Sequence, residues 1–126
     1  MLYIDTNILI YLFESHDPFS KQVARVLEEF TKANKPLVTS TITVTEFLAG
    51  TDSSNLKTLH QVPNLIIIPL NESLAEQAAI LQRKFKMQIG DSIHLATAIE
   101  QPAESFFTND KKLASIVEKY IPVIGL

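Results

Sequence analysis

The chain of 126 residues contains no cysteine and only three glycines. Without cysteine it can form neither a disulfide nor a thiolate zinc site, and it has no cysteine nucleophile. The glycines, at positions 50, 90 and 125, never form a G-x-G pattern, which argues against a glycine-rich loop that binds phosphate. Any chemistry must therefore be carried by acidic and polar side chains.

Long apolar segments and an excess of positive charge are also missing. No run approaches the ~18 apolar residues that a membrane-spanning helix needs. The longest, Ile8–Phe13, has no basic region before it and follows Asp5 and Asn7, unlike the apolar part of a secretory signal. We therefore expect a cytosolic protein with no contact to a membrane. The net charge of −3 argues against a protein that binds nucleic acid by positive charge alone, but divalent cations could offset its acids.

Short apolar segments alternate with helical patterns along the chain, and no linker or repeat divides it. The length fits a single domain, residues 1–126. Helices are expected at Thr6 to about Glu14, from Asp17-Pro18, over Ser40–Ala49 and Asn55–Gln61, after Asn71, from Gly90, and after Asn109 or Asp110. Strands are expected at Leu2–Ile4, Pro36–Thr39, Leu65–Ile68, Ser105–Phe107 and Pro122–Ile124. The strands are too apolar to have one face in water, which predicts an α/β fold with helices on both faces of a parallel sheet.

Four acids occupy related places in this pattern. Asp5 follows the first strand, Asp110 follows the strand Ser105–Phe107, Glu46 lies in the helix after the second strand, and Asp91 begins a helix. Because ligands of such sheets bind beyond the carboxyl ends of the strands, we expect these acids to converge on one rim. Carboxylates that close together repel unless a hard divalent cation, Mg²⁺ or Mn²⁺, offsets their charge. Metal-assisted hydrolysis of a phosphodiester is therefore the leading hypothesis.

Each acid also has a purely structural interpretation. Asp5, Asp91 and Asp110 could each cap the N-terminus of a helix, which stabilises it by about 0.5–2 kcal/mol. Thr43 and Glu46 are spaced as in a capping box. The occurrence of all four acids at one predicted rim is what favours a metal site over four separate caps.

In its motifs the chain resembles PIN-domain ribonucleases, and in particular the VapC-like toxins of bacterial toxin–antitoxin pairs. The resemblance spans essentially the whole chain, and its motifs are Ile4–Asn7, Thr45–Phe47, Gly90–Ala98 and Phe107–Asp110. It implies a PIN-like three-layer sandwich around a parallel sheet of about five strands. It also implies a homodimer, inhibition by a small antitoxin, and cleavage of RNA with Mg²⁺ or Mn²⁺.

The resemblance assigns roles to particular residues. Asp5, Glu46, Asp91 and Asp110 correspond to the family's acidic quartet, with Asp5 and Asp91 as the principal metal ligands. The polar groups that would orient the carboxylates, water or phosphate are Thr6, Asn7, Thr108 and Asn109. The candidates for RNA binding are Arg83, Lys84, Lys86, Lys111 and Lys112, although either cluster also fits an ordinary solvated helix face.

The histidines are expected to be secondary. His94 shares a helix face with Asp91, and we expect it to have a structural or orienting role, because the family's chemistry needs no histidine base. His16 and His60 are expected on the surface. The apolar helix Ile8–Phe13 is either central to the fold or partly covered by a second subunit or an antitoxin.

Two other functions remain open. A housekeeping RNA-processing nuclease would have the same site without an antitoxin. A non-catalytic binding module could keep the fold, although it would then keep four mutually repelling acids without a metal.

Overall fold

The computed structural model describes residues 1–14, 18–50 and 55–126. Five strands form one sheet in the order β3-β2-β1-β4-β5, and every neighbouring pair is parallel. Each predicted strand is present with bounds shifted by at most one residue, which confirms the α/β fold. The strands are β1 (Leu2–Ile4), β2 (Leu37–Ser40), β3 (Leu65–Ile68), β4 (Ser105–Phe107) and β5 (Val123–Ile124).

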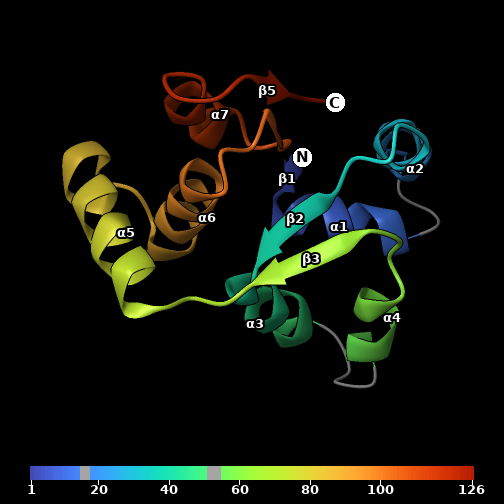
Figure 1. Cartoon of the computed structure of the whole chain (residues 1–126), viewed down its shortest axis with the longest axis horizontal. Helices are drawn as coiled ribbons and strands as arrows, with labels where there is room; N and C mark the ends of the chain where they lie inside the picture. The colour runs from blue at the N-terminus through green and yellow to red at the C-terminus, as the bar shows by residue number, and fades with distance from the viewer. Residues whose placement is uncertain (15–17, 51–54) are drawn as a thin grey trace.

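Within the described ranges, seven helices cover the two faces of the sheet (Figure 1). Successive side chains of β1 point to opposite faces of the sheet. Leu2 and Ile4 pack with the first four helices, whereas Tyr3 packs with the last three. One face carries α1 (Thr6–Phe13), α2 (Ser20–Lys32), α3 (Thr41–Ala49) and α4 (Leu56–His60). The other carries α5 (Glu72–Phe85), α6 (Ile89–Glu100) and α7 (Lys111–Val117). The result is the expected three-layer sandwich.

The expectation that every strand is covered on both faces is wrong for β3. This strand lies at the edge of the sheet, its Ile66 is 44% exposed, and its other three residues are half-buried. Its run of one leucine and three isoleucines looks in sequence like a central strand. Burial depends on its position in the strand order, which composition does not determine.

The start of α5 follows the expected capping chemistry, whereas the start of α2 does not. Asn71 caps α5 by accepting a hydrogen bond from the Leu74 amide at 2.8 Å. The helix predicted from Asp17-Pro18 instead begins at Ser20, and Pro18 lies in a turn. The proposed Asp17 cap and the surface position of His16 fall outside the described residues. None of the helices in the described part is long and apolar enough to cross a membrane.

The strand order indicates where a ligand would bind: at the rim formed by the carboxyl ends of the strands, beside β1. β1 lies between β2 and β4, so the chain leaves it in one direction first and returns on its other side. Crevices form at such points, beyond the carboxyl ends of the strands. Asp5 directly follows β1, and its amide donates to the Phe107 carbonyl at 3.1 Å, which aligns the ends of β1 and β4.

Candidate active site

Asp5 is a buried carboxylate at this rim, with 5% of its surface exposed. Its Oδ1 accepts from the Thr6 amide at 2.8 Å, and its Oδ2 accepts from the Thr108 hydroxyl at 2.8 Å. Asp5 is therefore the N-cap of α1, as the structural interpretation proposed. The cap does not account for the burial of its charge, because helix caps are usually in contact with water. Burial raises the pKa of Asp5, and the charge of His94 and the hydrogen bonds from Thr108 and Thr6 oppose that rise.

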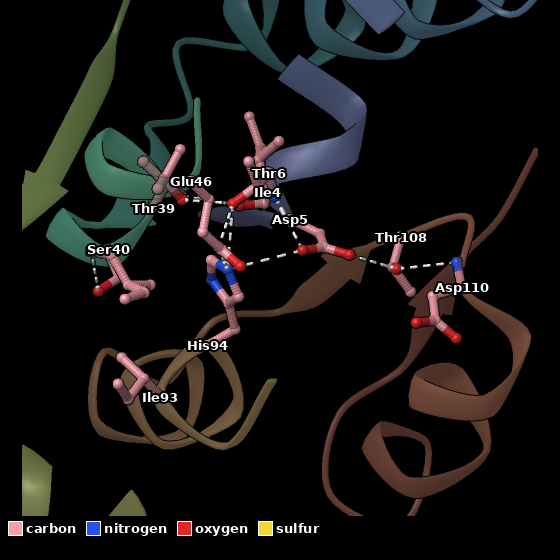
Figure 2. Close-up of polar contacts among 12 residues, drawn as sticks. Ile4, Asp5, Thr6, Thr39, Ser40, Glu46, Ile93, His94, Thr108 and Asp110 are labelled. Carbon is pink, nitrogen blue, oxygen red and sulfur yellow. Dashed lines mark hydrogen bonds and ion pairs between the residues drawn. The ribbon is translucent and has the colours of Figure 1, made fainter. Parts of the chain in front are cut away.

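Glu46 points from α3 across the rim toward α6 (Figure 2). One of its oxygens, Oε1, accepts from the Thr6 hydroxyl at 2.7 Å and lies 2.8 Å from His94 Nε2. The hydrogen bond with His94 is the main reason that the pKa of Glu46 is lowered. Among the described residues Oε2 accepts no hydrogen bond, so one oxygen of the carboxylate is fixed and the other is unpaired. The side chain is 39% exposed, which lets solvent reach it.

His94 is the buried hub of this network, with 1% of its surface exposed. Its Nδ1 lies 2.6 Å from the Tyr3 hydroxyl on β1, and its Nε2 is 3.7 Å from Asp5 Oδ1. Burial raises the pKa of Tyr3, so the phenol keeps its proton and donates to Nδ1. With Nδ1 as the acceptor, Nε2 carries an N–H group that donates a hydrogen bond to Glu46 Oε1 at 2.8 Å. The orienting role expected of His94 fits this geometry and remains a prediction, whereas Tyr3 was not singled out from the sequence.

The expected capping box at Thr43 and Glu46 is wrong. The N-cap of α3 is Ser40, whose hydroxyl accepts from the Ile42 amide at 3.2 Å. The Thr43 hydroxyl instead contacts those of Thr39 and Thr6, at 2.7 and 3.1 Å. Helix α3 begins one turn earlier than the capping-box spacing requires, which leaves both Thr43 and Glu46 free to face the rim.

Asp110 and Asp91 approach the rim from the other side. Asp110 is the N-cap of α7, and its Oδ1 accepts from the Lys112 and Leu113 amides at 3.0 and 3.1 Å. Its own amide donates to the Thr108 hydroxyl at 3.1 Å, which links it to Asp5 (Figure 2). Asp91 lies in the first turn of α6, half-buried. The rim thus receives acids from four different elements.

The pKa of Asp91 records how close these acids lie. It is raised to about 6, first by burial and then by the negative charges of Asp5 and Asp110. Within the described ranges, however, no three acids or histidines are placed so that they could already hold one metal ion. The acids are close enough to repel one another, and their side chains are not yet arranged as a coordination sphere.

Of the other predicted site residues, Thr6 and Thr108 contact the acids directly, as described above. Asn7 is exposed in the first turn of α1. Asn109 is half-buried and donates to the Tyr11 hydroxyl at 3.5 Å, away from the acids. The exposed basic residues lie at the end of α5 (Arg83, Lys84, Lys86) and the start of α7 (Lys111, Lys112). His60 is exposed, as expected.

We predict that Asp91→Asn raises the thermal stability of the metal-free protein at pH 7. The pKa of this acid is about 6 in the folded protein and 3.8 without the fold, so the folded state binds more protons between these values. Its contribution to the free energy of unfolding therefore falls as pH rises from about 4 to about 7. Calorimetry in EDTA should give a larger melting-temperature difference between variant and wild type at pH 7 than at pH 4.

The control for this experiment is Glu100→Gln, which removes an exposed acid from the same helix, α6. It should show no comparable growth of the difference with pH. A melting-temperature difference for Asp91→Asn that is equal at both pH values would contradict the expected effect.

Comparison with known proteins places this geometry in a family. The family model for the PIN domain matches residues 2–119. The comparison with curated proteins finds no match.

Several solved structures share the fold. A toxin–antitoxin complex from Klebsiella pneumoniae has a TM-score of 0.76 and 27% identity, covering 98% of this chain and 96% of that one. VapBC2 from Rickettsia felis, bound to a DNA fragment from its promoter, has a TM-score of 0.76 and 19% identity, covering 100% and 99%. VapC20 from Mycobacterium tuberculosis, a toxin that cleaves the sarcin–ricin loop, has a TM-score of 0.70 and 17% identity, covering 92% and 95%.

Proposed function

This chain belongs to the PIN domain family, and on that basis we propose that it is a metal-dependent endoribonuclease, formed by a single domain of residues 1–126. PIN domains are typically nucleases. The observation that carries the proposal is the gathering of Asp5, Glu46, Asp91 and Asp110 at one rim, where repulsion and burial raise the pKa of Asp91 to about 6. Because acids this close repel one another, they lower the stability of the folded protein, and a bound cation would remove that repulsion.

The residues present fit Mg²⁺ or Mn²⁺. Both ions prefer oxygen ligands, and the rim offers carboxylates with no cysteine nearby. We propose Asp5 and Asp91 as the principal ligands, with Glu46 and Asp110 completing the site. When bound, a divalent cation would polarise the phosphodiester and lower the pKa of water for hydrolysis.

The other polar residues would keep the acids in place. Thr108 fixes one oxygen of Asp5, while Thr6 and His94 fix one oxygen of Glu46. Such contacts typically change metal affinity or activity 10–100-fold when they are removed. Within the described ranges no hydrogen bond joins Asn7 or Asn109 to the four acids, so for these two residues we propose contact with the RNA rather than with the carboxylates.

The test is cleavage of a mixed pool of structured RNAs by the purified protein. We expect cleavage with Mn²⁺ or Mg²⁺, loss of cleavage with EDTA, and recovery when the metal is returned in excess. Sequencing of the 5′-phosphate ends would then identify the target. A protein that binds neither metal nor RNA when folded would contradict the proposal and favour the non-catalytic module.

We further propose that the chain is the toxin of a toxin–antitoxin pair, acting in the cytoplasm. The structures it resembles include toxin–antitoxin complexes, one of them at 27% identity. A partner would have a surface to cover, because Leu12 and Phe13 of the apolar helix α1 line an open, mainly apolar cavity of about 360 Å³ with Ala24, Leu27 and Val62. A small adjacent gene whose product binds this chain and stops cleavage would support the pair.

A homodimer is part of the same proposal, and light scattering at micromolar concentration would measure it. A housekeeping RNA-processing nuclease is the alternative. It would cleave RNA with the same residues, and its gene would have no such neighbour.

A further inference from the structure

A second feature opens directly beside the acids. A cavity of about 100 Å³ lies where the end of α5, the start of α6 and the first turns of α7 meet. Asp91 and Asp110 form part of its wall, and so do Lys86 and Lys112. A ligand in this cavity would lie against two of the predicted metal ligands, Asp91 and Asp110, and against two lysines. An anionic group such as a phosphate could bind there to a cation held by the acids and to the lysines at the same time.

The rest of the wall is apolar apart from the side-chain amide of Gln88. Met87 and Leu113 are 8% and 2% exposed, and Phe85 and Ile116 are half-buried beside them. Gln88 also lines the cavity; it is the N-cap residue of α6, yet its side chain makes no capping hydrogen bond. A nucleobase has the matching chemistry, because its faces are apolar and its edge carries hydrogen-bond donors and acceptors.

The backbone at the cavity is strained. Lys86 ends α5 with φ 55° and ψ 44°, the left-handed conformation that usually belongs to glycine at this position. The Cβ atom of a lysine makes this conformation less favourable than it is for glycine. Strain of this kind tends to persist where the residue has a functional contact. Here it places an ammonium-bearing side chain at the wall of the cavity.

Positive charge continues outward from the cavity. The ammonium groups of Lys84 and Lys119 lie 5.3 and 5.4 Å from the centre of the Phe85 ring. They come from α5 and from the segment after α7, which are distant in sequence. The chain as a whole has a net charge of −3, so this group of lysines is a local excess of positive charge. It could bind the phosphates of a nucleic-acid strand that continues beyond the cavity. Lys119 was not among the residues predicted from the sequence.

We infer that this cavity receives the base of the nucleotide next to the cleaved phosphate of an RNA strand, with Gln88 facing the edge of the base. The inference rests on the proposed function, which supplies RNA as the substrate. It makes Gln88 a determinant of base preference and Lys86 and Lys112 contacts for the adjoining phosphate.

The two methionines of the chain allow a direct test. Met87 lines the cavity, whereas Met1 precedes β1 at the opposite end of the strands and its ammonium group is bound to Glu104. We would label both methyl groups with ¹³C and titrate the folded protein with AMP, CMP, GMP, UMP or inorganic phosphate in the presence of Mg²⁺. We expect the Met87 methyl signal to shift with the nucleotides and much less with phosphate, while Met1 stays unchanged.

Variants with matched controls make the test specific. Ile116→Phe fills the cavity and should abolish the Met87 shift, whereas Ile80→Phe adds the same ring at a site on α5 that is 51% exposed and outside the cavity. If Ile116→Phe does not fold, the exposed Lys112→Glu should weaken nucleotide binding at least tenfold, with the exposed Lys57→Glu on α4 as its control.

Gln88→Ala should reduce discrimination among the four bases by roughly fivefold or more.

The outcomes separate this inference from the proposed function. A Met87 signal that no nucleotide moves, or that phosphate moves equally, overturns the cavity assignment even when the wild-type protein cleaves RNA. A Met87 shift abolished by Ile116→Phe supports the nucleotide cavity. If the wild-type protein then fails to cleave RNA with metal, the proposed nuclease activity is overturned, and the cavity remains a nucleotide-binding site with no cleaved phosphate beside it.

Discussion

Asp5→Asn should reduce RNA cleavage by roughly 1,000-fold or more while the protein stays folded. A divalent cation supplies several kcal/mol of transition-state stabilisation. At about 1.4 kcal/mol for each tenfold change in rate, losing it corresponds to about three orders of magnitude. Asp5 is the acid most enclosed at the rim, with 5% of its surface exposed, so no water or neighbouring acid can readily replace its charge.

The fold should tolerate this change because asparagine is itself a good N-cap. The asparagine oxygen can still accept from the Thr6 amide, and its amide group can donate to the Thr108 hydroxyl, whose proton is then free to turn away. Burial raises the pKa of Asp5, so removing the charge also removes an unfavourable contribution in the metal-free protein. We therefore expect a melting temperature in EDTA equal to or above that of the wild type.

The control separates capping from chemistry. Asn71→Ala removes the side-chain cap of α5, away from the rim, and should lower stability by about 1 kcal/mol without changing cleavage. Cleavage rates, melting temperatures and calorimetric Mn²⁺ binding would be measured on the three proteins. Full activity of Asp5→Asn would mean that the rim acids do not bind the metal used in catalysis.

The sequence predicted the strands and the rim well, for a physical reason. The short strands contain mostly apolar residues and end at polar ones, and in a parallel sheet all carboxyl ends lie at the same edge. The strand pattern alone therefore predicted that Asp5 and Asp110 lie at the same rim. The same reasoning placed Glu46 and Asp91 only approximately, because each projects from a helix whose rotation depends on its exact start.

The contacts between side chains could not be read from the sequence. Tyr3 and His94 are 91 positions apart, and their hydrogen bond depends on the packing of α6 against β1. One signal was present: β1 carries a tyrosine between Leu2 and Ile4, and a buried phenol needs a partner. For β3, a run of apolar residues indicates a strand with a half-buried surface but not its place in the strand order, so the exposure of Ile66 was not predictable.

Gly90→Ala should lower RNA cleavage about 10–100-fold, the range found when a metal ligand loses its support, with little change in stability. A Cβ atom at Gly90 would lie 2.9 Å from Glu46 Oε2 and 3.6 Å from its Cδ. Contacts that close do not persist, so the carboxylate must move. Glu46 would then lose its place between the Thr6 hydroxyl and His94 Nε2.

The fold should survive because the atoms in conflict end a flexible side chain. Alanine is favoured over glycine in a helix by roughly 1 kcal/mol. This gain offsets the loss of hydrogen bonds worth about 0.5–1.5 kcal/mol each. The matched control is Gly50→Ala, since a Cβ atom at Gly50 meets no atom of the described residues within 4 Å and φ there is −99°. That variant should cleave RNA as the wild type does.

A double variant would test whether the defect arises at Glu46. Glu46→Asp withdraws the carboxylate by one methylene and should lower cleavage by itself. In the Gly90→Ala background it relieves the contact with the new methyl group, so the double variant should lose less activity than the product of the two single effects. If the effects simply multiply, the two positions act independently. If Gly90→Ala alone cleaves at the wild-type rate, the position of Glu46 beside α6 has no part in the reaction.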